Sequence, residues 1–331
     1  MSDPLYRLTF DATVILREHP PRFEHPHKVR LFEIAYPADS QPHGMVEVTR
    51  WSRSTTEPLT LSEPLATAVQ PNYYDYVAVS PSGGSVEWHV NFADPRLFGA
   101  YGSRLFAQDE MQVAEHPVLA SVREALIARN LPAMTIDDTG PTPVLVRNVE
   151  RRIAVATNPD KAAGRPCGLY GNAFAASSID VVERATRRID PPEISNIIAM
   201  AAPACGSGEY SERDIEYVFA TAITAFAAAR EESRRSAGAE VRAIVHSGFW
   251  GCGAFGGNRR LMIAVQTLAA RAARVDKLVL HAGDAAGAEE MNRGLALADT
   301  LATRCGTPCS LSKLVGRVAL LGLRWGVSDG N

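Results

Sequence analysis

The sequence predicts an α/β fold with a largely parallel central sheet that helices cover on both faces. Short apolar runs typical of buried strands alternate with segments of helical periodicity in the second half of the chain: strands at 197–202, 242–246 and 278–281, and helices that begin at Ser211, Asn258 and Glu289. Parallel strands need crossover connections, and helices usually supply them. Ligands of such sheets bind beyond the carboxyl ends of the strands.

The first half of the sequence differs from the second in composition and pattern. Prolines are frequent before residue 85, and the short runs 30–36, 45–49 and 75–80 have the apolar character of half-buried strands. A strand at 86–93, a helix that begins at Gln108 and another helix through 119–127 follow. We therefore expect a strand-rich accessory region at 1–85, a catalytic region at 86–304 and a C-terminal tail at 305–331.

Composition narrows the class of protein. Hydrophobic residues make up 46% of the 331 residues, enough for a large buried core, and 34 basic against 37 acidic side chains leave a net charge of −3. Nucleic-acid-binding proteins usually carry an excess of basic side chains, and this sequence does not. No apolar run approaches the roughly 20 residues of a membrane span, and the N-terminus does not resemble a signal peptide. We expect a cytoplasmic protein with neither nucleic acid nor membrane as a partner.

Five cysteines, few and odd in number, argue against a disulfide framework and fit a reducing compartment. Cys305 and Cys309 have the spacing of half a zinc site, but a second pair of ligands is not found near them. The sequence therefore predicts no metal and no cofactor.

The first candidate site follows the strand at 86–93. Residues 90–94 lead into a loop that contains Gly99 and Gly102, and Gln108, Asp109 and Glu110 stand where the next helix begins. Loop N–H groups backed by a helix N-terminus favour an anion. Two adjacent carboxyl groups can divide the work of a glycosidase, one as general acid and the other as a grip on hydroxyl groups. The alternative is that both merely favour a helix N-terminus.

The second candidate site has five glycines within residues 248–257, between a clear strand and a clear helix. Glycines permit positive φ and a close approach of backbone to ligand, and the helix from Asn258 adds a dipole that favours phosphate. The segment is neither a P-loop nor a Rossmann fingerprint, because Gly-Lys-Ser/Thr does not follow and the glycine spacing fits poorly. The alternative is a tight packing turn.

Together the two segments resemble the poly(ADP-ribose) glycohydrolases. Gly248-Phe-Trp-Gly-Cys-Gly-Ala-Phe-Gly-Gly257 is similar to the phosphate-binding loop of that family. Residues 90–110 are similar to its signature, in which a strand ending Phe-Ala-Asn precedes three glycines and Gln-Glu-Glu follows seven residues later. The match continues to His116-Pro117, and residues 278–284 resemble the strand and Gly-Asp turn that come later. About 40 residues carry the resemblance, within a region from roughly 75 to 304.

The resemblance implies a macrodomain, a three-layer α/β/α sandwich around a mostly parallel or mixed sheet, here with an N-terminal β-rich extension. It implies a glycosidase that hydrolyses a ribosyl bond in ADP-ribose conjugates, with a small-molecule nucleotide as its ligand. By position, Glu110 resembles the catalytic acid and base, Asp109 the residue that holds ribose hydroxyls, Gln108 the reader of adenine and Asp94 the contact to the distal ribose. The diphosphate loop maps onto Gly251, Cys252, Gly253, Ala254, Phe255 and Gly256.

The sequence also departs from the family pattern. Phe98-Gly99-Ala100 replaces the three glycines, so we expect the Phe98 side chain to occupy space near the diphosphate and the distal ribose. Phe249 and Ala282 replace an asparagine and a phenylalanine, and Asp109 is one methylene shorter than glutamate. Two other functions remain open: a glycosidase of a small NAD-derived or other nucleotide-linked metabolite, and a non-catalytic reader of ADP-ribose or another nucleotide. Tyr170 is a candidate for the tyrosine that covers the substrate.

Overall fold

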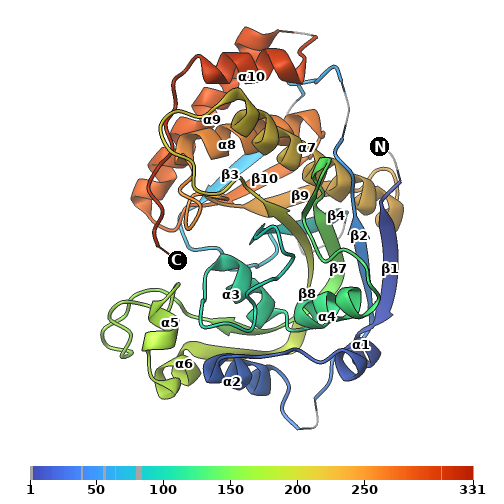
Figure 1. The fold of residues 1–331 in the computed structure, drawn as a ribbon, viewed down its shortest axis with the longest axis vertical. Helices are drawn as coiled ribbons and strands as arrows, with labels where there is room; N and C mark the ends of the chain where they lie inside the picture. The colour runs from blue at the N-terminus through green and yellow to red at the C-terminus, as the bar shows by residue number, and fades with distance from the viewer. Residues whose placement is uncertain are drawn as a thin grey trace.

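The computed structural model describes residues 3–38, 40–54, 57–63, 65–79, 84–306 and 308–330. An eight-stranded sheet runs through the molecule in the order β1-β2-β7-β8-β4-β9-β10-β3 (Figure 1). In that order its strands are Tyr6–Asp11, Met45–Arg50, Val144–Val155, Thr186–Ala201, Ser85–Ala93, Arg242–Ser247, Lys277–His281 and Ala66–Gln70. A separate pair, β5 (Ile136–Asp137) and β6 (Gly140–Pro141), forms a short hairpin.

The sheet is parallel in one half and antiparallel in the other. Strands β8, β4, β9, β10 and β3 pair in parallel, whereas β1, β2, β7 and β8 pair antiparallel. The parallel half is the one that the strand–helix alternation predicted, and it brings the carboxyl ends of β4, β9 and β10 together. The fold is therefore α/β with a mixed central sheet, as the sequence predicted.

Helices form a layer on each face of the sheet (Figure 1). On one side lie α7 (Glu212–Ala237), α8 (Arg259–Ala272), α9 (Ala285–Cys305) and α10 (Leu311–Ala319). On the other lie α1 (Ala12–Glu18), α2 (Pro26–Ala35), α3 (Gln108–Glu115), α4 (Val118–Ala128), α5 (Ala173–Ala176) and α6 (Ile179–Ala185). A large apolar cluster fills the first interface, and two smaller ones fill the second. No helix in the described part of the chain is long and apolar enough to cross a membrane.

Residues before 85 contribute to the main sheet at both of its edges. β1 and β2 pair with each other and extend the sheet beyond β7, and β3 pairs with β10 at the opposite edge. The strand expected at 45–49 is confirmed as β2. The strand expected at 30–36 is wrong: Pro26 starts α2, and His25 accepts a hydrogen bond from the backbone of His27 as its cap. Residues 75–79 are not in a strand, and Ser80 lies outside the described residues.

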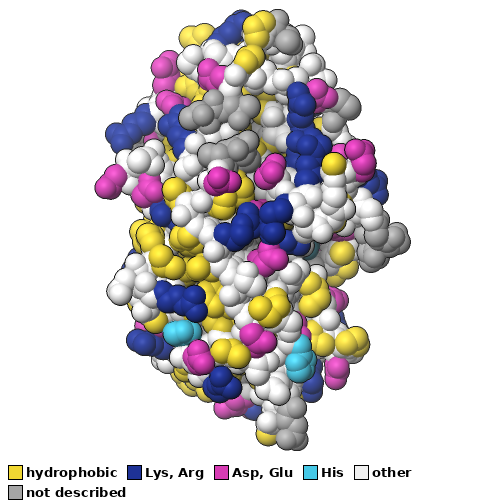
Figure 2. All heavy atoms as spheres, turned by 90° about the vertical axis from the view of Figure 1, so that its right-hand side faces the viewer, with side chains coloured by type: hydrophobic (Ala, Val, Ile, Leu, Met, Phe, Trp, Pro, Cys, Tyr) yellow, Lys and Arg dark blue, Asp and Glu magenta, His cyan; other side chains and the backbone are white. Residues whose placement is uncertain are grey.

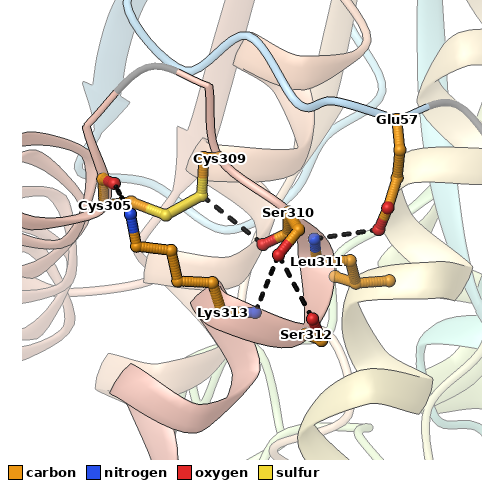
Figure 3. Close-up of a disulfide and its surroundings, with 7 residues drawn as sticks. All are labelled: Glu57, Cys305, Cys309, Ser310, Leu311, Ser312 and Lys313. Carbon is orange, nitrogen blue, oxygen red and sulfur yellow. Dashed lines mark hydrogen bonds between the residues drawn. A yellow bond between two sulfur atoms is a disulfide. The ribbon is translucent and has the colours of Figure 1, made fainter.

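The expectation of unpaired cysteines also needs correction, because Cys305 and Cys309 form a disulfide (Figure 3). The bond closes the turn between α9 and α10, where the two Cα atoms lie 5.6 Å apart. Lys313 donates a hydrogen bond to the Cys305 carbonyl, and Glu57 accepts one from the Leu311 backbone. Both cysteines are buried. The spacing that resembled half a zinc site therefore belongs to a local disulfide.

Charged side chains on the β1 side of the molecule are interspersed by sign (Figure 2). Glu232 on α7 accepts from Arg7 on β1 and from Arg235 one turn along α7, and Glu47 on β2 pairs with Arg147 and Arg235. These cross-strand and strand–helix pairs tie the antiparallel edge of the sheet to α7.

Candidate functional site

A cavity of about 900 Å³ opens at the carboxyl ends of the parallel strands. Gln108 of the first predicted segment and Phe249, Cys252 and Gly253 of the second all line it. The two glycine-bearing segments, separated by about 140 residues in the chain, therefore converge on one cavity. Further lining residues come from Tyr73, Tyr74 and Tyr76, from the segment 157–170 after β7, from His281 to Asp284, and from the C-terminal residues Leu323, Gly326, Val327 and Asp329.

Gln108 fixes the start of α3 against strand β4. Its Oε1 accepts a hydrogen bond from the Phe92 backbone at 2.6 Å, and its Nε2 donates to the Val90 carbonyl and to the Tyr76 hydroxyl, each at 3.2 Å. The amide is thus committed to holding the helix on the sheet at the edge of the cavity. The predicted contact of Gln108 with adenine would therefore use the part of its side chain that faces the cavity.

Asp109 and Glu110 lie behind the cavity wall and are almost fully buried. Asp109 Oδ1 accepts from the Asn91 side chain at 3.0 Å, and Glu110 Oε2 accepts from the backbone of Ala107, the N-cap residue of α3, at 2.9 Å. Glu110 therefore does stabilise the N-terminus of α3, which was the alternative role that the sequence left open. It coexists with an unusual setting, because two adjacent carboxyl groups are removed from water together.

A buried lysine from the N-terminal region stands near this pair. Lys28 on α2 is 2% exposed, donates to the Tyr101 carbonyl at 2.8 Å, and lies 5.2 Å from the centre of the Phe106 ring. Burial lowers the pKa of Lys28 to about 8, and the charges of Glu110 and Asp109 oppose that shift. Sequence analysis missed this residue, because nothing in its local pattern distinguishes it from a surface lysine.

Burial also raises the pKa of both carboxyl groups. The pKa of Asp109 rises to about 8, first because of burial and then because of the neighbouring Glu110 charge. Burial raises the pKa of Glu110 as well, against the opposing effect of the Lys28 ammonium. A carboxyl group that keeps its proton toward neutral pH can donate that proton to a leaving group.

The raised pKa of Asp109 predicts a pH-dependent stability. An unfolded aspartate loses its proton near pH 4, whereas folded Asp109 keeps its proton up to about pH 8. The contribution of protonated Asp109 to the free energy of unfolding is therefore full below pH 4 and is lost as the pH rises to 8. Asp109→Asn keeps an acceptor for Asn91 and cannot ionise. We expect the melting temperature of the native chain to fall between pH 5 and pH 8 by roughly 5 °C more than that of the variant. Calorimetry at the two pH values measures this; equal slopes would contradict it.

The loop that replaces the three glycines packs away from the cavity. Phe98 is fully buried in the apolar cluster around Leu119 and Val113, so its side chain does not fill the cavity as expected. Its φ of +52° is in the left-handed region that glycine favours, so the backbone keeps a glycine-like conformation at this position. Gly99 and Ala100 also lie outside the cavity wall, as does Asp94, whose carboxylate accepts from the Arg96 backbone at 2.9 Å.

The second loop is shaped by close backbone contacts. Gly251 has a φ of +74°, and a Cβ there would lie 2.5 Å from the Ala202 side chain; a Cβ at Gly257 would lie 2.6 Å from the Gly251 carbonyl. Asn258 caps α8 by accepting from the Leu261 backbone at 3.0 Å, which points the helix N-terminus at the loop. The Arg259 guanidinium lies 4.7 Å from the Phe249 ring centre. The loop is thus a tight glycine turn directly before a helix N-terminus, and anion binding there stays a prediction.

Tyr170 connects the two segments across the cavity. Its hydroxyl lies 3.6 Å from the position that a Cβ at Gly253 would take, and it receives a hydrogen bond from the backbone of Gln108. The pKa of Tyr170 is raised to about 12, first by burial and then by the charges of Asp329 and Glu110. The side chain therefore lies between the glycine loop and the start of α3, and its role as the covering tyrosine stays a prediction.

A buried chain of polar side chains ends at the other side of the cavity. Glu87 Oε2 lies 2.7 Å from His246 Nε2, and His246 Nδ1 lies 3.2 Å from His281 Nε2. The Tyr74 ring stacks on His281 at 4.7 Å, and burial lowers the pKa of His281 to about 4. Glu87, His246 and His281 come from three adjacent parallel strands. The structure shows that they form one hydrogen-bonded line across β4, β9 and β10.

The C-terminal segment, residues 324–330, lies along the second glycine loop (Figure 1). Gly326 donates to the Gly256 carbonyl at 2.8 Å, and Ser328 Oγ donates to the Ala254 carbonyl at 2.7 Å. Asp329 Oδ2 lies 3.0 Å from the position of a Cβ at Gly253. Phe255, the remaining predicted loop residue, accepts from the Cys205 backbone at 3.1 Å. The contact of the C-terminus with the loop was not foreseen from the sequence.

The described residues contain no group of three or more His, Cys, Asp or Glu side chains that could hold a metal ion.

Comparison with known proteins gives one family match. Residues 168–288 match the model for poly(ADP-ribose) glycohydrolase (PARG), macro domain fold. That range contains the second glycine loop and the turn after β10, but not the first segment. No curated protein sequence matches the chain.

Solved structures of bacterial poly(ADP-ribose) glycohydrolases are also similar. The enzyme from Thermomonospora curvata is 17% identical, with a TM-score of 0.48 and coverage of 86% of this chain and 96% of that one. The same enzyme with the inhibitor ADP-HPD is 18% identical, with a TM-score of 0.47 and the same coverage. The enzyme from Deinococcus radiodurans with ADP-ribose is 14% identical, with a TM-score of 0.43 and coverage of 71% and 86%. The family match confirms, over residues 168–288, the resemblance that the sequence indicated, and the description of the matching model names the macrodomain fold that the resemblance implied.

Proposed function

We propose that this divergent relative of the poly(ADP-ribose) glycohydrolases is a glycosidase that hydrolyses a ribosyl bond in ADP-ribose conjugates. The observation that carries the proposal is that the second glycine loop and Gln108 line one cavity, and that a buried carboxyl pair with raised pKa values directly follows Gln108 on α3. A phosphate loop alone would suit a reader of nucleotides. The acidic pair adds a proton donor that a reader does not need.

The binding end of the site follows from the second loop. Loop amides and the α8 N-terminus favour the negative charge of a diphosphate, and the Arg259–Phe249 stack adds a cation at the same rim. The tyrosines Tyr73, Tyr74 and Tyr76 supply flat apolar surface at the far side of the cavity, suited to a nucleotide base. A small-molecule nucleotide, ADP-ribose or a conjugate of it, fits both ends.

The chemical step is assigned to Glu110. In the first half of the reaction its carboxyl proton passes to the oxygen that leaves the anomeric carbon, and the C–O bond breaks through a cationic ribosyl transition state. In the second half the carboxylate removes a proton from the attacking water, which restores Glu110 and completes hydrolysis. Asp109 lies beside it and is assigned to a ribose hydroxyl. The hydrogen bond from Ala107 anchors the Glu110 carboxyl in position.

Product analysis tests the proposal. The purified chain is incubated with poly(ADP-ribose), with a protein carrying single ADP-ribose units, and with a small ADP-ribosyl conjugate, and free ADP-ribose is measured by chromatography. Release from at least one of the three supports the glycosidase. Release from the small conjugate alone assigns a metabolite substrate. Binding of ADP-ribose without release from any of them would overturn the catalytic assignment and leave a nucleotide reader.

A further inference from the structure

The C-terminal segment covers the part of the cavity that an anionic ligand would need. Its anchor is Trp325, whose ring stacks on Tyr210 with centroids 4.1 Å apart, and whose backbone donates to the Gly208 carbonyl at 2.9 Å. Gly206 permits this packing, since a Cβ there would overlap the indole at 2.0 Å. The anchor holds the chain immediately before the residues that contact the glycine loop.

Beyond the anchor, the segment follows the loop residue by residue. Gly326 pairs with Gly256, Ser328 with Ala254, and the Asp329 backbone with the Gly253 carbonyl at 3.4 Å. The Gly330 carbonyl accepts from Asn172 at 3.2 Å, so the far end is tied to the opposite wall. Contacts at both ends and along the middle distinguish this segment from a tail that merely rests on the surface.

The group that the segment delivers to the loop is a carboxylate. Asp329 Oδ2 lies 3.0 Å from the position of a Cβ at Gly253, next to the Tyr170 hydroxyl that faces the acidic pair. Backbone amides of a glycine loop bind carboxylate and phosphate oxygens by the same physics. A diphosphate brought to the same loop would meet a fixed negative charge at close range.

We propose that the C-terminal segment is an internal mimic of the ligand: hydrogen bonds to the carbonyls of Gly253, Ala254 and Gly256 hold it over the glycine loop with the Asp329 carboxylate beside Gly253, and it must leave before a diphosphate binds. The inference rests on the proposed function only in taking the ligand to be an anionic nucleotide. The segment competes from within the same molecule, so it needs little intrinsic affinity to be effective. The apparent affinity for ligand falls by the fraction of molecules in which the segment is undocked.

Affinity measurements on three variants test this. A chain that ends at Trp325 keeps the anchor and removes the covering residues; Asp329→Asn removes only the charge; Asp138→Asn removes one charge from an exposed loop and serves as the matched control. Titration calorimetry with ADP-ribose should show binding at least tenfold tighter for the shortened chain, a smaller gain for Asp329→Asn, and no change for Asp138→Asn. Equal affinity of the full and shortened chains would overturn the inference.

Hydrogen exchange separates this inference from the proposed function. Without ligand, the amides of residues 251–257 should exchange faster in the shortened chain than in the full chain, because the covering segment is gone. Unchanged exchange would refute docking of the segment, whatever the chain binds. If no form binds ADP-ribose, the proposed function fails; faster exchange together with inorganic diphosphate binding only to the shortened chain would still support the mimic.

Discussion

Glu110→Gln is expected to lower turnover by about a thousandfold while ADP-ribose binding changes by less than about threefold. General acid–base groups typically contribute factors of 10² to 10⁴ to rate. Glutamine keeps an oxygen that can accept the Ala107 hydrogen bond, so the α3 cap and the fold are retained. It has no proton to give to a leaving oxygen near neutral pH. The measurement is kcat on the substrate identified by product analysis, beside a calorimetric Kd.

The control for this change is its neighbour on the same helix. Glu115 is also buried and also has a raised pKa, but one of its carboxylate oxygens pairs with Arg151 at 2.8 Å and the other accepts from the Val155 backbone at 2.8 Å, so both are held by β7. Glu115→Gln should therefore reduce stability and leave kcat of the folded fraction largely intact. A Glu110→Gln chain that retains full kcat would remove Glu110 from the mechanism.

The parallel half of the sheet could be predicted because its signals are local. Residues 242–272 show an apolar run, a dense glycine loop and an amphipathic helix in succession, and each part has the conformation its composition favours. The Ser211 capping box likewise fixes the start of α7 from four consecutive residues. The run 30–36 misled because seven residues are too short to separate strand from helix, and Pro26 at the helix start decided the outcome.

The parts of the site that could not be predicted come from distant segments. Lys28 and Asp329 carry no motif of their own, and each reaches the site through packing that the local sequence does not encode. For Phe98 the sequence did yield a prediction, and the prediction was wrong. Its side chain suggested an obstruction, but a positive φ at that residue turns the ring into the core, and a backbone dihedral is not visible in residue type alone.

Gly251→Ala is expected to reduce stability by about 2–4 kcal/mol and to weaken ADP-ribose binding at least tenfold. Two costs add up at this residue: an alanine at a φ of +74° is strained, and its Cβ would lie 2.5 Å from the Ala202 side chain at the end of β8. To relieve this steric overlap the loop must move away from β8, and that movement also disturbs the hydrogen bond from the Gly257 backbone to the Gly251 carbonyl. Denaturant unfolding and calorimetry measure the two effects.

Gly306→Ala separates strain from steric overlap, because Gly306 has a nearly equal φ of +71° but open space where the Cβ would lie. It should cost only about 1 kcal/mol and leave ligand binding unchanged. The excess loss at Gly251 then measures how firmly β8 fixes the loop. If the two variants were equally stable and bound ADP-ribose equally well, the close contact with Ala202 would not shape the anion site. The five glycines at 248–257 would then serve only as a turn, the alternative that the sequence left open.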